Sequence, residues 1–136
     1  FCGYNMGDYW QHWLDMGKVI PNPPKIFHVN WFRTDDEGNF IWPGFGDNMR
    51  VLNWIIDRCE GKADAVETPI GYEPKPEDIN IEGLNIDLDT LKGLLDVDKN
   101  LWKEDAAGIE EFYQKFGDKL PKELKAELET LKKNLD

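Results

Sequence analysis

The residues best suited to chemistry lie in one aromatic stretch of the sequence, around three phenylalanines. Phe32 closes an apolar run, Phe40 follows the polar turn 35–39, and Phe45 lies between two glycines. If the turn folds the chain back, Phe32 and Phe40 become neighbours, and the glycine-flanked loop lets Phe45 approach both. Three aromatic faces around one gap suit a flat π-system such as a purine, although stacking alone does not tell bases apart.

Discrimination between bases requires polar groups, and Asn48 follows the same loop. Its side chain offers an amide donor and a carbonyl acceptor. A guanine edge carries an acceptor beside donors, so this carboxamide together with backbone groups could recognise it. The alternative interpretation is a plain aromatic mini-core in which Asn48 only caps a helix.

Other kinds of site find little support in the sequence. It contains no Gly-x-x-x-x-Gly-Lys-Ser/Thr phosphate loop and no Cys/His cluster with zinc spacing. His12 and His28 are expected to be packed or surface side chains, and Cys2 and Cys59 to be free thiols. We therefore assign no catalytic residue and no metal ligand to this sequence.

Composition limits the partners that the chain can have. Its 136 residues are 40% hydrophobic and 32% charged, which is typical of a soluble globular domain, and the formal net charge is −11. Such a charge argues against nucleic acid or an anionic membrane as a partner. The sequence begins at Phe1 rather than methionine, and we expect it to be a piece of a longer chain.

The elements that must position the aromatic stretch are a mixture of helices and short strands. We expect a helix over 8–16 ended by Gly17, a strand over 25–32, a short return strand over 40–42, and a helix capped by Asp47 that ends near Gly61. These elements form an aromatic segment, residues 1–61.

The second half of the chain is expected to be mostly helical. Residues 62–86 contain Pro69, Gly71, Pro74 and Pro76, which predict an irregular connection. Residues 87–136 predict three amphipathic helices, the first two capped by Asp87 and Asp98 and the third with Pro121 in its first turn. The predicted fold class is mixed α/β, mostly helical, with a short strand or hairpin and about five helices.

The sequence also resembles, in several segments, one enzyme family, the GTP-dependent phosphoenolpyruvate carboxykinases. The resemblance runs in order along the chain and is strong through Tyr72. The segments that carry it are Phe1-Cys2-Gly3-Tyr4-Asn5, Trp13-Leu14, Pro24-Lys25-Ile26-Phe27-His28-Val29-Asn30-Trp31-Phe32-Arg33, Phe40-Ile41-Trp42-Pro43-Gly44-Phe45-Gly46-Asp47-Asn48 and Thr68-Pro69-Ile70-Gly71-Tyr72.

This resemblance implies the C-terminal part of the carboxykinase nucleotide-binding domain, in which Phe32, Phe40 and Phe45 enclose the guanine of GTP or GDP and Asn48 contacts its polar edge. It implies a parent enzyme of gluconeogenesis that converts oxaloacetate and GTP to phosphoenolpyruvate, carbon dioxide and GDP, with Mn²⁺ at the active site and Mg²⁺ on the nucleotide. The family's phosphate loop, metal ligands and mobile lid lie earlier in the full chain.

From the resemblance we expect a cytoplasmic, monomeric parent enzyme, and a piece that holds and orients the nucleotide but is inactive alone. The isolated piece could self-associate through the edge of the strand 25–32. The competing hypothesis is a non-catalytic protein-interaction module, with an aromatic groove for a peptide and an acidic helical tail as a docking surface.

Overall fold

The computed structural model describes residues 2–136 and divides the chain into two compact units. One unit joins Phe1–Pro24 to Val97–Asp136, and the other is Lys25–Asp96. Over the described residues the elements are five α-helices, one two-stranded sheet and three short 3₁₀-helices. The predicted class, mixed α/β and mostly helical, is therefore confirmed.

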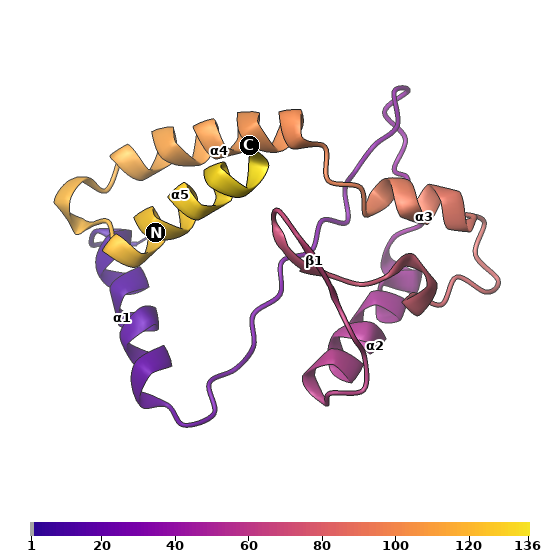
Figure 1. The fold of residues 1–136 in the computed structure, drawn as a ribbon, viewed down its shortest axis with the longest axis horizontal. Coiled ribbons are helices and arrows are strands. Elements are labelled where there is room, and N and C mark those ends of the chain that lie inside the picture. The colour runs from indigo at the N-terminus through magenta and orange to yellow at the C-terminus, as the bar shows by residue number, and fades with distance from the viewer. Residues whose placement is uncertain (1) are drawn as a thin grey trace. The chain divides into compact units, whose positions relative to one another are not determined.

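The first unit consists of three helices: α1 (Met6–Val19), α4 (Lys99–Gln114) and α5 (Lys122–Leu135). The helices α4 and α5 lie side by side as an antiparallel pair (Figure 1). Their apolar stripes meet in a small core whose buried members are Ala106, Leu128 and Leu135. The narrow apolar stripes in the sequence predicted this kind of packing.

The helix α1 is docked on the end of this pair by aromatic packing and by close backbone approach. The ring of Trp10 lies 4.6 Å from that of Phe116, centroid to centroid, at an angle of 56°. At Gly7 a Cβ atom would lie only 2.2 Å from the backbone oxygen of Lys119. A glycine is therefore required where α1 meets the short helix η3 (Gly117–Lys119).

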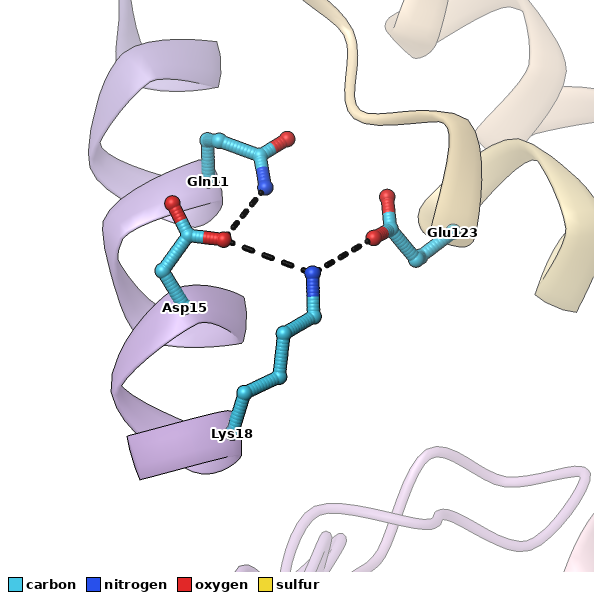
Figure 2. A network of polar contacts seen from close by, with 4 residues as sticks. All are labelled: Gln11, Asp15, Lys18 and Glu123. Carbon is cyan, nitrogen blue, oxygen red and sulfur yellow. Dashed lines mark hydrogen bonds and ion pairs between the residues drawn. The ribbon is translucent and has the colours of Figure 1, made fainter. Parts of the chain in front are cut away.

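A polar network on the surface also joins α1 to α5 (Figure 2). The Nζ atom of Lys18 lies 3.1 Å from Oε1 of Glu123 and 3.4 Å from Oδ1 of Asp15, to which Gln11 donates at 3.0 Å. The bond to Glu123 raises the pKa of Lys18, and the bond from Gln11 lowers the pKa of Asp15. The three charged groups are exposed, so the network orients the helix ends more than it stabilises them.

The expected end of α1 at Gly17 is wrong, because the helix continues to Val19 and begins earlier, at Met6. The backbone N–H of Ile20 still bonds to the Met16 carbonyl, at 3.0 Å. Gly17 has no Cβ and meets no neighbour, so it is tolerated inside the helix at an entropic cost. The start is set by Asn5, whose Oδ1 accepts from the N–H of Gly7 at 2.8 Å.

The second unit contains α2 (Asn48–Cys59), α3 (Leu88–Leu94) and a small antiparallel sheet of β1 (Val66–Thr68) and β2 (Gly71–Glu73). Its core contains the buried side chains Trp42, Trp54, Ile79 and Leu91. The short 3₁₀-helix η1 (Phe45–Asp47) directly precedes α2, and a second one, η2 (Pro76–Asp78), directly precedes the core residue Ile79.

The predicted strand over 25–32 is wrong, since the structure has no strand there. The segment runs as an extended tube without helix or ladder (Figure 1). Phe27 and Trp31 still pack on the core, while Ile26 and Phe32 are 75% and 70% exposed. The stretch is an extended chain that is partly buried, and strand propensity alone cannot supply a hydrogen-bonding partner.

The return strand over 40–42 is reduced to one isolated bridge, in which Thr34 pairs with Phe40. The stretch 62–86 contains more structure than expected, since the β1–β2 hairpin lies within it. In its register Thr68 pairs with Gly71, and the hydroxyl of Thr68 donates to the Gly71 carbonyl at 2.8 Å. Strands of three residues are too short to show an alternating pattern in the sequence. The prolines of this stretch therefore led to the prediction of an irregular connection.

The predicted caps have mixed outcomes. Asp87 caps α3 by accepting from the N–H of Thr90 at 2.8 Å, and Asp98 caps α4 by accepting from Asn100 at 2.8 Å, so both predictions are confirmed. Asp47 precedes α2 but makes no capping bond, and instead pairs with Arg50 at 3.1 Å. The 3₁₀-helix η1 gives Asp47 a helical backbone, which is unlike the extended backbone of a usual N-cap.

Candidate functional site

The candidate site begins with a tight turn that folds the chain back after Thr34. The N–H of Asp35 donates to the Asn39 carbonyl at 2.9 Å, and the N–H of Ile41 donates to the Arg33 carbonyl at 3.0 Å. Gly38 in this turn has a φ of +85°, a conformation that favours glycine. These bonds set Phe32 and Phe40 on the two arms of the turn.

The carboxylate of Asp35 fastens the turn from inside. Its Oδ1 accepts from the N–H of Asn39 at 2.8 Å and from the N–H of Glu37 at 3.0 Å. The backbone N–H of Asn39 is the main reason that the pKa of Asp35 lies below its ordinary value. The turn thus depends on an ionised side chain at its first position.

Phe32 and Phe40 are neighbours, as the turn predicted. Their ring centroids lie 5.9 Å apart with an interplanar angle of 62°, an edge-to-face arrangement. Both rings remain exposed, at 70% and 64% of their surface. The pair therefore offers an open aromatic surface rather than a packed one.

Phe45 lies at the start of η1 and is 95% exposed. Gly44, just before it, has φ +99° and ψ −151°, a conformation that is nearly restricted to glycine. Within the described residues the ring of Phe45 has no aromatic partner, so the structure does not bring it onto Phe32 and Phe40. The backbone conformation of Gly44 sets the direction in which the chain enters Phe45.

The mini-core interpretation does not describe this arrangement. A mini-core would bury the three phenylalanine rings, and all three are among the exposed large apolar side chains. It would also use Asn48 as a helix cap, but Asn48 is the first residue of α2 rather than its cap, and its Oδ1 accepts from the indole of Trp42. Exposed aromatic groups on adjacent loops are more typical of a binding surface.

Asn48 instead bonds to a tryptophan of the core. Its Oδ1 accepts from Nε1 of Trp42 at 2.9 Å, in a half-buried position at the start of α2. Trp42 is only 5% exposed and packs in the core cluster with Trp54. The side chain proposed for base recognition is thus hydrogen-bonded to a buried residue of this unit's core.

Two arginines that gave no signal in the sequence also position the site. Arg33, next to Phe32, donates through Nη1 to the carbonyls of Gly93 and Leu94 at 3.0 and 2.8 Å, at the C-terminal end of α3. Arg50 donates to the Asn80 carbonyl at 2.8 Å. Neither contact was predictable from a local pattern, because each joins residues at least 30 positions apart.

A hollow of about 510 Å³ lies along α2 in the same unit, outside the aromatic residues and Asn48. Its lining is mostly polar, and consists of Gly46, Asp47, Met49, Arg50, Asn53, Trp54, Asp57, Asp78 and Asn80. The hollow begins at Gly46, one residue from Phe45. We assign it no ligand.

Among residues 2–136 no group of three or more His, Cys, Asp or Glu side chains could hold a metal ion. None of the helices in this described part of the chain has the length and apolar character of a membrane span. Cys2 and Cys59 are exposed and free, as expected.

Comparison with known proteins gives one family. Residues 1–134 match the model of the phosphoenolpyruvate carboxykinase C-terminal P-loop domain. Relatives named phosphoenolpyruvate carboxykinase (GTP) include those of Treponema pallidum, 52% identical over 139 residues, Renibacterium salmoninarum, 51% over 137, and Thermoplasma volcanium, 48% over 135.

These matches cover 99 to 100% of the chain but only 22 to 23% of the relatives. The chain therefore spans about a fifth of the length of the curated relatives that it matches.

Proposed function

The chain belongs to the GTP-dependent phosphoenolpyruvate carboxykinase family, and we propose that it supplies the guanine-binding part of such an enzyme. In this proposal Phe32, Phe40 and Phe45 stack on the base, and Asn48 bonds to its polar edge. The observation that carries the proposal is the open aromatic surface: three exposed phenylalanine rings on one turn and the adjacent loop, next to Asn48.

The physical chemistry of the surface supports a flat aromatic ligand. Stacking on an aromatic side chain is worth roughly 1–3 kcal/mol per base. Phe32 and Phe40 contact each other edge to face, and most of each ring's surface remains exposed and accessible to a ligand. Phe45 follows Gly44, whose backbone conformation is nearly restricted to glycine, and its exposed ring is available to stack on the second face of a base.

The proposed enzyme converts oxaloacetate and GTP to phosphoenolpyruvate, carbon dioxide and GDP, a reaction of gluconeogenesis that we place in the cytoplasm. Phosphoryl transfer depends heavily on positioning, so a fixed guanine sets where the γ-phosphate lies. The described residues do not fit the Mn²⁺ and Mg²⁺ ions that the resemblance implies. We assign to this chain only the binding and orientation of the nucleotide.

A chimeric enzyme tests this assignment. The 136 residues would replace the matching segment of the Treponema pallidum carboxykinase, which is 52% identical. We expect a folded chimera that forms phosphoenolpyruvate with GTP and not with ATP. In the same chimera Phe45→Ala should raise KM for GTP about 5- to 150-fold, the equivalent of one lost stacking contact.

The matched control is Tyr72→Ala, which removes an exposed aromatic ring outside the proposed site. It should leave KM for GTP unchanged. A folded chimera without activity, or a Phe45→Ala chimera with the KM of the parent chimera, would refute the assignment.

A further inference from the structure

One hydrogen bond joins the buried core of the second unit to the proposed base-binding surface. Nε1 of Trp42 donates to Oδ1 of Asn48 at 2.9 Å. Trp42 is 5% exposed and is held among Trp54, Ile79 and Leu91. The indole therefore cannot turn away from Asn48 without disturbing the core.

This bond determines which end of the Asn48 amide faces the core. The two ends of a carboxamide have nearly the same shape, so only hydrogen bonding decides their orientation. An indole N–H donates and never accepts. Oδ1 must therefore face Trp42, and Nδ2, for which the described residues provide no acceptor, is directed elsewhere as a donor.

From this geometry we propose that Trp42 is a positioning residue for base selectivity, which it exerts by holding Nδ2 of Asn48 ready to donate to position 6 of a bound purine. Guanine carries a carbonyl acceptor at position 6, and adenine carries an amino donor. A fixed donor therefore favours guanine and opposes adenine. The inference rests on the proposed function, because it requires a purine at this surface.

Without the indole N–H the amide of Asn48 is free to rotate. It could then present Oδ1 to an amino group as readily as Nδ2 to a carbonyl. The loss of selectivity should be confined to position 6 of the purine. Position 2 should not be affected, since the bond from Trp42 constrains only one side chain.

The chain offers a matched pair of variants for the test, Trp42→Phe and Trp54→Phe. Both change a tryptophan of the same core, 5% and 6% exposed, to the same smaller residue. The indole nitrogen of Trp54 is buried and has no hydrogen-bond partner among the described residues. Only Trp42→Phe therefore removes an N–H that positions Asn48.

The dissociation constants of GDP, IDP and 2,6-diaminopurine riboside diphosphate are measured by NMR titration for the unsubstituted 136-residue chain, called the parent chain, and for both variants. IDP lacks the 2-amino group of GDP, and the diaminopurine nucleotide replaces the 6-carbonyl by an amino group. In Trp42→Phe the preference for GDP over diaminopurine should fall about 2- to 10-fold, the effect of one hydrogen bond. The preference for GDP over IDP should remain that of the parent chain, and Trp54→Phe should change neither.

If Trp42→Phe does not fold, 3-benzothienylalanine at position 42 replaces it, because this residue keeps the indole shape and has sulfur in place of the N–H. A parent chain that binds none of the three nucleotides would contradict the proposed function itself. The other informative outcome begins with a parent chain that prefers GDP. If the folded position-42 variant then prefers GDP over the diaminopurine nucleotide as strongly as Trp54→Phe does, the role of Trp42 is overturned and the proposed function still stands.

Discussion

At the scale of single residues, Phe45 gives the sharpest prediction because its ring is 95% exposed and packs on no aromatic neighbour among the described residues. Phe45→Ala should weaken the binding of GDP to the chain by roughly 1–3 kcal/mol, the worth of one stacked ring. The thermal midpoint should hardly change, since little contact area is lost. Calorimetric titration and thermal denaturation of the same sample measure both.

Tyr72→Ala is the control for nonspecific loss of aromatic surface, since Tyr72 is 67% exposed and lies in β2. It should bind GDP as the parent chain does. Equal GDP affinities for Phe45→Ala and the parent chain would remove Phe45 from the proposed site.

The ionised side chain of Asp35 gives a pH-dependent prediction. Because bonds from the Asn39 N–H hold its pKa below the ordinary value, the contribution of Asp35 to the turn is complete above its unfolded pKa. It is lost as the pH falls through the lower pKa of the folded chain. The amide proton signal of Asn39, followed by NMR against pH, should therefore show a midpoint below the ordinary Asp value of about 3.9.

Asp35→Asn keeps an acceptor oxygen at the same position and cannot titrate in this range. In this variant the acid transition of the Asn39 signal should disappear. A midpoint at or above the ordinary value in the parent chain would contradict the observed bonding of the turn.

The sequence predicted some features of the site and could not predict others. The turn 35–39 with glycine at a positive φ was enough to bring Phe32 and Phe40 together. The role of Trp42 was not readable, because its bond to Asn48 depends on how the core orients the indole. The position of Phe45 also remains a prediction, since no ring contact ties it to the other two.

At the scale of elements, the docking of α1 depends on the absence of a side chain at Gly7. Gly7→Ala would place a Cβ 2.2 Å from the Lys119 carbonyl oxygen, so α1 or η3 must move. Such overpacking typically costs about 1–3 kcal/mol. We expect a matching loss in the free energy of unfolding, measured by urea denaturation.

Gly17→Ala is the matched control in the same helix, since a Cβ added there would have no neighbouring atom within 4 Å. It should stabilise the chain by about 0.5–1 kcal/mol through helix propensity. If the two variants were equally stable, the close approach at Gly7 would not exist in solution.

The elements also show where sequence patterns fail. Helices were predicted well, because caps such as Asp87 and Asp98 are local and act within three residues. The strand over 25–32 was not, because a strand exists only with a partner, and in the structure no residue of this stretch pairs with another segment; the isolated bridge of Thr34 with Phe40 lies just beyond it. The hairpin of β1 and β2 was missed for the opposite reason, since its strands are too short for a pattern.

At the scale of the whole molecule, the chain exposes more apolar surface than a self-contained domain would need. In α1 alone, Trp13 and Val19 are 50% and 69% exposed. The relatives are more than four times as long as the part matched here, and such faces are suited to contact with further protein. Self-association of the isolated chain stays a prediction, and it would now use these apolar faces rather than a strand edge.

We also predict that the chain alone does not catalyse the reaction. Its sequence has no phosphate loop, and its described residues offer no metal-binding cluster. With oxaloacetate, GTP, Mn²⁺ and Mg²⁺, no phosphoenolpyruvate should form above the blank, while the full-length Treponema pallidum enzyme should be active in the same assay. Turnover by the purified chain would contradict the division of labour that we propose.

The most direct test of guanine binding is a titration of the chain with GDP and, separately, ADP, followed by intrinsic tryptophan fluorescence. Trp31 is half-buried next to Phe32, and Trp42 bonds to Asn48, so an occupied site should quench or shift their emission. We predict a saturable response to GDP and a much weaker one to ADP. A folded chain that responds to neither nucleotide would contradict the claim and favour the alternative of a protein-interaction module.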